Sequence, residues 1–190
     1  MTRFKKTVIS AIWLGMSITV SVGQDDNSSS KRKSYRHGAT ISTEYNKERD
    51  ETKVELKQMS IPRPRLNNNH NLNITAYFTY PGKQPAKPES VILGIVSASF
   101  DRARKFEELR DLKVGIGSET VNFGQMELLT SRVMSGYYKE VLGIAIPFES
   151  FVRMLSANND SMDMSVGLQR FQLEKNHVEA LRDLAGRVEQ

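Results

Sequence analysis

The sequence predicts a mainly β protein whose antiparallel strands pack as a β-sandwich, with a partly open barrel as the alternative. About eight short segments between residues 39 and 173 alternate apolar and polar side chains, and turn residues separate them. Towards the end of the chain the apolar period becomes helical, which predicts a short helix near 148–157 and a C-terminal helix near 176–188. Two packed sheets with the last helix over one edge or open end would bury these apolar faces.

The first part of this β-rich region contains four predicted strands. Residues 39–45 and 54–61 alternate on either side of a charged turn. Residues 72–80 alternate most clearly, with one apolar and one polar face, as in an antiparallel sheet with one solvated side. Residues 91–100 are apolar on both faces, which predicts a central strand that is covered on both sides.

The middle of the region is less regular. Residues 101–113 are highly charged and predict a short helix or an irregular strand. Residues 112–116 and 121–123 alternate around a Gly-Ser turn, and the alternation slips by one residue at Gly124, which predicts a β-bulge. Residues 138–146 then form the next predicted strand.

The last part contains the two helices and a hairpin. Apolar residues recur at helical spacing from Phe148 to Leu155, directly after a proline. Residues 162–173 alternate around a glycine-containing turn and predict a hairpin. Asn176 and Glu179 have the spacing of a capping box, so we expect the final helix to begin there.

Residues 1–23 predict a secretory signal peptide. Three cations in the first six residues precede an uncharged run at 7–22, and Gly23 ends a small-x-small pattern that suits cleavage before Gln24. The uncharged run is shorter than the roughly 20 residues that cross a bilayer as a helix, so we expect no stable membrane span after cleavage. An uncleaved membrane anchor is the alternative.

The predicted leader is followed by a tail and a single domain. Residues 24–38 have no aliphatic side chain, so we expect a flexible tail because such a segment cannot offset the entropy of ordering. Residues 39–190 are then a single β-rich domain. The full chain carries 27 Lys and Arg against 22 Asp and Glu, but three of the cations lie in the leader. A nucleic-acid partner is therefore not expected.

The chain contains no cysteine. This excludes disulfides, zinc–thiolate sites, a cysteine nucleophile and a lipidated N-terminal cysteine. Together with the leader, it favours an exported protein of the bacterial periplasm or exterior.

The C-terminal quarter of the chain resembles uncharacterised secreted bacterial domains in its layout. The residues that carry the resemblance are IAIPFESF at 144–151, MSVG at 164–167, FQL at 171–173 and ALRDL at 180–184. They are mostly packing residues. The resemblance therefore implies a fold and export, and it implies no activity.

No catalytic, cofactor-binding or metal-binding residue is assigned from the sequence. His37, His70 and His177 fall in the tail, in a loop and on the last helix, and none has the spacing of a zinc motif. We expect His177 on the solvated surface. Ser97 and Ser99 lie on the predicted central strand, where hydroxyl groups usually bond to nearby backbone.

Tyr77 and Tyr137 are the candidate partner contacts, since Tyr77 points to the polar face of its strand, and Tyr137 and Tyr138 lie on opposite faces, so that one of them is expected to be exposed. Cross-strand packing on a partly covered face is the alternative. The expected function is that of a non-enzymatic interaction domain with a protein or envelope-glycan partner. A small-ligand carrier and a hydrolase with a site assembled in space are the alternatives. A His–carboxylate pair or paired carboxylates in a cleft would favour an enzyme, and an exposed apolar patch at either tyrosine would favour interaction.

Overall fold

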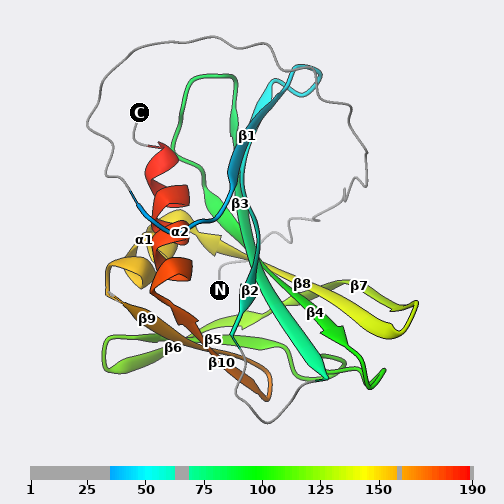
Figure 1. Ribbon diagram of the computed structural model, residues 1–190. Coiled ribbons are helices and arrows are strands. Elements are labelled where there is room, and N and C mark those ends of the chain that lie inside the picture. Colours follow the sequence, from blue (N-terminus) through cyan, green and yellow to red (C-terminus); the bar gives the residue numbers. More distant parts are fainter. Residues whose placement is uncertain (1–34, 63–68, 158–159, 189–190) are drawn as a thin grey trace, which may run out of the picture. The chain divides into compact units, whose positions relative to one another are not determined.

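The computed structural model describes residues 35–62, 69–157 and 160–188, which form two antiparallel sheets and two helices (Figure 1). The six-stranded sheet has the order β1-β2-β3-β4-β8-β7, and the four-stranded sheet has the order β10-β9-β5-β6. The strands are β1 (Ile41–Asn46), β2 (Glu51–Ile61), β3 (His70–Pro81), β4 (Ser90–Ser99), β5 (Asp111–Ile116), β6 (Glu119–Gln125), β7 (Glu127–Met134), β8 (Tyr137–Pro147), β9 (Ser161–Val166) and β10 (Gln169–Glu174). The helices are α1 (Phe148–Ser156) and α2 (Lys175–Ala185). The predicted sandwich-like fold is confirmed, and neither described sheet closes into a barrel.

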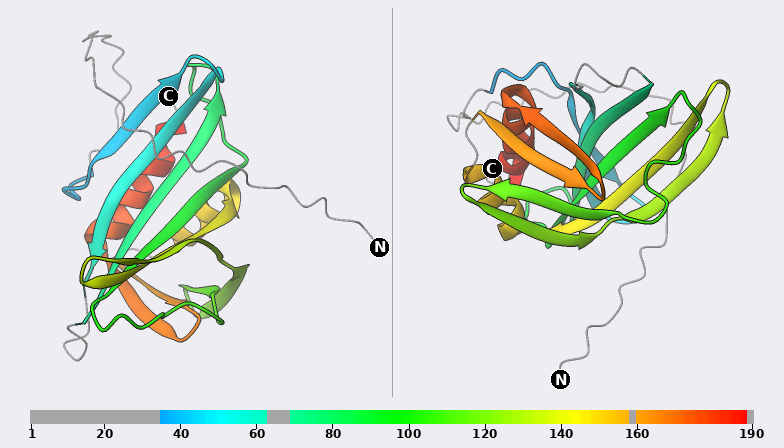
Figure 2. Two further views of the ribbon diagram at one scale, coloured as in Figure 1. Left: turned by 90° about the vertical axis from the view of Figure 1, so that its right-hand side faces the viewer. Right: turned by 90° about the horizontal axis from the view of Figure 1, so that it is seen from below.

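Both helices and the smaller sheet lie on one side of the six-stranded sheet (Figures 1 and 2). Helix α1 contacts β4 and β8, and α2 contacts β2 and β10. Their buried side chains share one core with the side chains of the large sheet that point the same way, such as Ile74, Leu93 and Leu142. We call this covered side of the large sheet its inner face and the opposite side its outer face.

The prediction of a short helix or an irregular strand over 101–113 is wrong for residues 101–110, which form neither, and only its last three residues lie in a strand, at the start of β5. Hydrogen bonds from the backbone amides of this charged segment to side chains fix its conformation, instead of the backbone hydrogen bonds of a regular sheet. Asp101 accepts a hydrogen bond from the Ala103 amide at 3.0 Å, and Phe106 is fully buried. Arg102 has a positive φ of 57°, which a helix or strand does not allow.

The slip in alternation near Gly124 marks the crossing from one sheet to the other. Phe123 has no partner on β5, because Leu112 pairs with Gly124 and Lys113 pairs with Asn122. The bulge that the sequence predicts therefore lies at Phe123, next to Gly124. The chain leaves the small sheet after Gln125 and joins the large one two residues later.

The capping box of α2 lies two residues earlier than the predicted Asn176–Glu179 pair, and His177 is buried instead of solvated. The N-cap is Glu174, whose amide donates to Nδ1 of His177 at 3.2 Å. Because Nδ1 accepts, the ring proton lies on Nε2, which donates to the Ser60 carbonyl at 2.9 Å. Both ring nitrogens have partners, so the ring can be buried against β2 at low cost.

Gly167 and Gly117 offer a matched test of packing at two hairpin turns. Their φ values are +55° and +61°, so alanine is strained at either, by about 1–2 kcal/mol. A Cβ at Gly167 would also lie 2.0 Å from the Leu109 carbonyl oxygen, whereas one at Gly117 meets nothing within 4 Å. We expect Gly167→Ala to lower the free energy of unfolding clearly more than Gly117→Ala in urea titrations. Equal losses would contradict this packing.

Candidate functional site

Tyr77 and Tyr137 both lie on the outer face of the six-stranded sheet. Tyr77 on β3 pairs with Ile92 on β4, near one end of that strand. At the other end, the ring of Tyr137 on β8 lies 5.8 Å from that of Phe100. Since alternate residues of a strand share a face, Ile92, Val96 and Phe100 point outward between the two tyrosines.

We call this set the outer lane: Tyr77, Ile92, Val96, Ala98, Phe100 and Tyr137. Its exposure is lowest in the middle of the sheet, where Val96 is 6% exposed, and highest at Phe100, which is 48% exposed. Val96 is a buried hydrophobic residue, whereas the other five lie outside the buried core. The lane is thus an apolar strip whose exposed area lies on either side of Val96, and within the described chain both helices and the second sheet lie on the other face.

Burial and the charged neighbours of Tyr77 both favour the neutral form of its hydroxyl group. Burial raises the pKa of Tyr77, and the carboxylates of Glu55 and Glu51 raise it further. The Lys53 ammonium lies 4.6 Å from the ring centroid and 3.1 Å from Glu55. Burial also raises the pKa of Glu55, but hydrogen bonds from Lys57 and Lys53 outweigh it and leave that pKa below its ordinary value. Tyr77 therefore presents a hydroxyl donor beside a cation–π contact.

A buried polar cluster lies at one end of the inner face. His70 begins β3 instead of lying in a loop, is 7% exposed, and its Nε2 is 2.8 Å from the Ser97 hydroxyl oxygen. Ser97 is fully buried and pairs with Glu140 across β4 and β8. The expectation that Ser97 bonds to nearby backbone is therefore replaced by a contact with a histidine from the neighbouring strand.

The carboxylate of Glu140 holds the charged segment over this cluster. Its two oxygens accept hydrogen bonds from the amides of Lys105 at 2.9 Å and Phe106 at 3.2 Å. The ring of Phe106 lies 6.2 Å from that of His70. A serine, a histidine and a carboxylate thus gather as in a hydrolase. However, Ser97 and Glu140 have no exposed surface, and both oxygens of the carboxylate accept hydrogen bonds from backbone amides. The cluster is a structural anchor in this conformation.

A second histidine contact fastens the residues before β1 to helix α2. His37 Nε2 lies 3.1 Å from Asp183, and His37 Nδ1 accepts from the Ala39 amide at 3.0 Å. Burial raises the pKa of Asp183, but hydrogen bonds from Arg187 and His37 outweigh it and leave the pKa below its ordinary value. This is a His–carboxylate pair, yet its side chains are only 7% and 17% exposed and its acid is also paired with Arg187.

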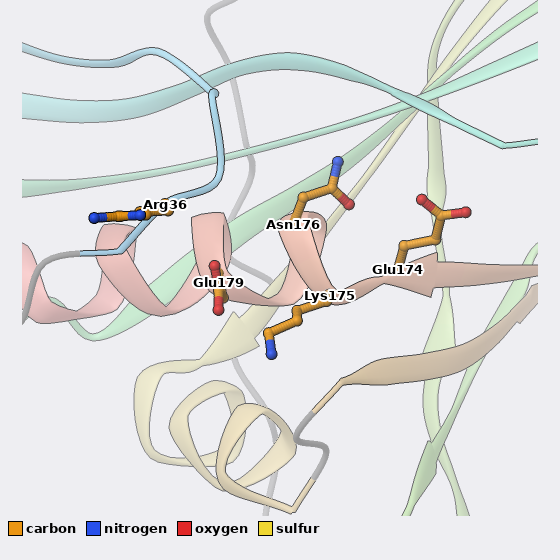
Figure 3. A pocket seen from close by; sticks show the side chains of 5 residues that line it. All are labelled: Arg36, Glu174, Lys175, Asn176 and Glu179. Carbon is orange, nitrogen blue, oxygen red and sulfur yellow. The ribbon is translucent and has the colours of Figure 1, made fainter.

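An open hollow of about 500 Å³ lies beside the start of α2 (Figure 3). It is lined by Arg36, Glu174, Lys175, Asn176 and Glu179. Its charged lining differs from the deep apolar cavity that a carrier of small apolar ligands requires. It also contains no histidine and none of the buried polar cluster. The hollow does hold two carboxylates, Glu174 and Glu179, which is the feature that would favour an enzyme. However, the Glu174 side chain accepts the capping hydrogen bond of α2, and the lining offers no histidine beside the carboxylates.

Metal and membrane features were also sought in the described residues. Over the ranges 35–62, 69–157 and 160–188, no three His, Asp or Glu side chains converge as metal ligands. Neither α1 nor α2 is long and apolar enough to cross a membrane. The predicted leader and most of the predicted tail lie outside the described residues.

Searches of protein-family models, curated proteins and solved structures found no match to this chain. The resemblance to secreted bacterial domains therefore stays an expectation. The sequence identified both tyrosines of the outer lane, but it missed the Ser97–His70 contact and the role of Glu140. One signal was available, because Glu140 occupies an inward position in the alternation of residues 138–146.

Replacing Glu140 should release the segment that it anchors. In Glu140→Gln the uncharged amide can offer an acceptor to only one of the two backbone amides, so we expect a loss of about 1–3 kcal/mol in the free energy of unfolding. Trypsin should also cleave faster at Arg104 and Lys105. The control is Glu107→Gln, which removes an exposed ion pair with Arg104 and should change stability by less than about 0.5 kcal/mol. Similar values for the two variants would contradict the anchoring role.

Proposed function

We propose that this chain is an exported, non-enzymatic interaction domain that binds a protein or glycan component of the cell envelope through its outer lane. The observation that carries the proposal is that Tyr77 and Tyr137 share one sheet face and are joined by the outward apolar residues of β4. The predicted leader and the lack of cysteine support export.

The lane suits binding for three physical reasons. Tyrosine offers a large, rigid contact area with a polar group at its tip, so little entropy is lost when a partner covers it. Apolar side chains outside the core gain free energy when a partner removes them from water. The tyrosines are eight strand positions apart, about 27 Å, which would let an extended partner lie along β4 and β8.

Site-specific photo-crosslinking in the native host tests this proposal. We expect p-benzoylphenylalanine in place of Tyr77 or Tyr137 to give one discrete adduct of the same mass, because both positions contact the same partner. Tyr137→Ser, combined with the crosslinker at position 77, should weaken that adduct at least tenfold, since central aromatic residues dominate binding energy.

Tyr45 provides the control position. It is an exposed tyrosine, 37% accessible, whose hydroxyl group donates to Asp50 at the turn between β1 and β2. A crosslinker there should give no such adduct. The absence of adducts at both 77 and 137, or equal adducts at 45, would contradict binding through the outer lane.

Export has its own prediction. We expect protein recovered from its native host to begin at Gln24, because the small residues before it fit a signal-peptidase site. Mass spectrometry of the N-terminal peptide measures this. An intact N-terminus in the membrane fraction would show that the leader stays as an anchor.

A further inference from the structure

Three segments meet at one end of the domain: the 100–110 segment, the β7–β8 hairpin end at 132–139 and the β9–β10 turn at 167–170. Arg104 lies 5.6 Å from the ring centroid of Tyr138, which joins the first segment to the second. The Gly167 amide donates to the Asp111 carbonyl at 3.1 Å, just after the first segment, and fixes the third beside it. We call these three segments together the loop end; in Figure 1 they lie on the lower side of the domain, and the right-hand view of Figure 2 shows that side.

Exposed apolar side chains are concentrated at the loop end. Of the five large hydrophobic residues that are exposed in the described chain, four lie here: Phe100, Leu109, Val133 and Leu168, at 48%, 52%, 66% and 81%. Leu168 occupies the second central position of a hairpin turn, where polar residues and glycine are usual. The positive φ that this hairpin turn requires is supplied by Gly167, at +55°. Backbone geometry therefore gives no reason for a leucine at position 168.

Cations surround these side chains. The three segments, 100–110, 132–139 and 167–170, carry seven Lys and Arg against three Asp and Glu. Arg132 and Lys139 face each other across β7 and β8, an arrangement of like charges that destabilises a sheet unless an anion neutralises it. Arg102, Arg132, Lys139 and Arg170 make no ion pair with any other described residue. The acids Asp101 and Glu107 are already paired, with Lys105 and Arg104, which leaves Glu108 in the 100–110 segment against these four cations.

We propose that the loop end docks on an anionic lipid bilayer, with Leu109, Val133 and Leu168 in the outer acyl region and the unpaired cations at the phosphates. Charge complementarity selects an anionic partner. The apolar residues come from separate turns instead of one flat patch. A fluid bilayer can accept such separate side chains, whereas a protein partner of ordinary affinity needs a continuous surface of about 800 Å². This surface differs from the middle of the outer lane, and the proposal does not depend on a partner there.

The absence of cysteine makes the test direct, because a single introduced cysteine is the only labelling site. The full chain carrying Leu168→Cys or Val133→Cys is labelled with an environment-sensitive nitrobenzoxadiazole dye and mixed with vesicles of phosphatidylglycerol and phosphatidylcholine. We expect a several-fold rise in fluorescence and quenching by nitroxide-labelled acyl chains. The same label at Tyr45→Cys, in the β1–β2 hairpin, should change little, which separates docking by the loop end from any contact made by the leader.

The charge requirement is tested with substitutions in the Leu168→Cys background. Arg132→Ser with Arg170→Ser should weaken binding to anionic vesicles about 25-fold, since each cation near an anionic surface contributes about fivefold. Arg49→Ser, at an exposed arginine of the β1–β2 turn, should leave it unchanged. Leu109→Ser should weaken binding about tenfold or more.

Several outcomes would overturn lipid docking. One is an unchanged signal at both 168 and 133, and another is equal insertion into pure phosphatidylcholine. A third is an equal response at Tyr45→Cys. A signal at 168 that appears only with an added protein, without acyl-chain quenching, would assign the loop end to a protein partner instead. Failure of these tests leaves the crosslinking result at Tyr77 and Tyr137 unaffected, so the two surfaces are judged separately.

Discussion

The rest of the structure depends on covering the inner face of one six-stranded sheet. That face is too long for one neighbouring element, so the helices cover part of it and the four-stranded sheet covers the rest. The chain therefore crosses between the sheets at Gln125–Glu127, with Met126 fully buried at the crossing. Burial of apolar area is the main stabilising force available to a chain without cysteine.

Polar groups are buried where the helices and the four-stranded sheet meet the large sheet. Specific hydrogen bonds satisfy several of these groups. His177 connects α2 to the Ser60 carbonyl of β2, and Glu140 connects β8 to the amides of the 100–110 segment. The Ser97–His70 contact joins β3 and β4 beneath that segment. An unsatisfied buried group would cost about 1–3 kcal/mol, so these contacts fix where the layers meet. The same requirement explains why a serine, a histidine and a carboxylate gather here without access for a substrate.

Covering one face of the large sheet leaves its other face and the turns at one end uncovered by the described residues. The outer lane is apolar with a tyrosine at each end, whereas the loop end has separate apolar tips among unpaired cations. These surfaces meet at Phe100, which contacts Tyr137 and begins the 100–110 segment. A domain that docked on an anionic bilayer through its turns would hold the outer lane in a fixed orientation towards other components of the same surface.

The sequence by itself determined most strands, both helices and the outward direction of Tyr77, because period-two and helical patterns report which face of an element is apolar. It named no strand over β7 (Glu127–Met134). It did not determine the structure of residues 101–110, the N-cap of α2 or the burial of His70 and His177. Each depends on a partner far away in the chain: Glu140 for Phe106, Ser97 for His70 and Ser60 for His177. Local pattern carries no information about such a partner. Only the packing of the two sheets and α2 brings the paired groups within hydrogen-bonding distance and makes their burial favourable.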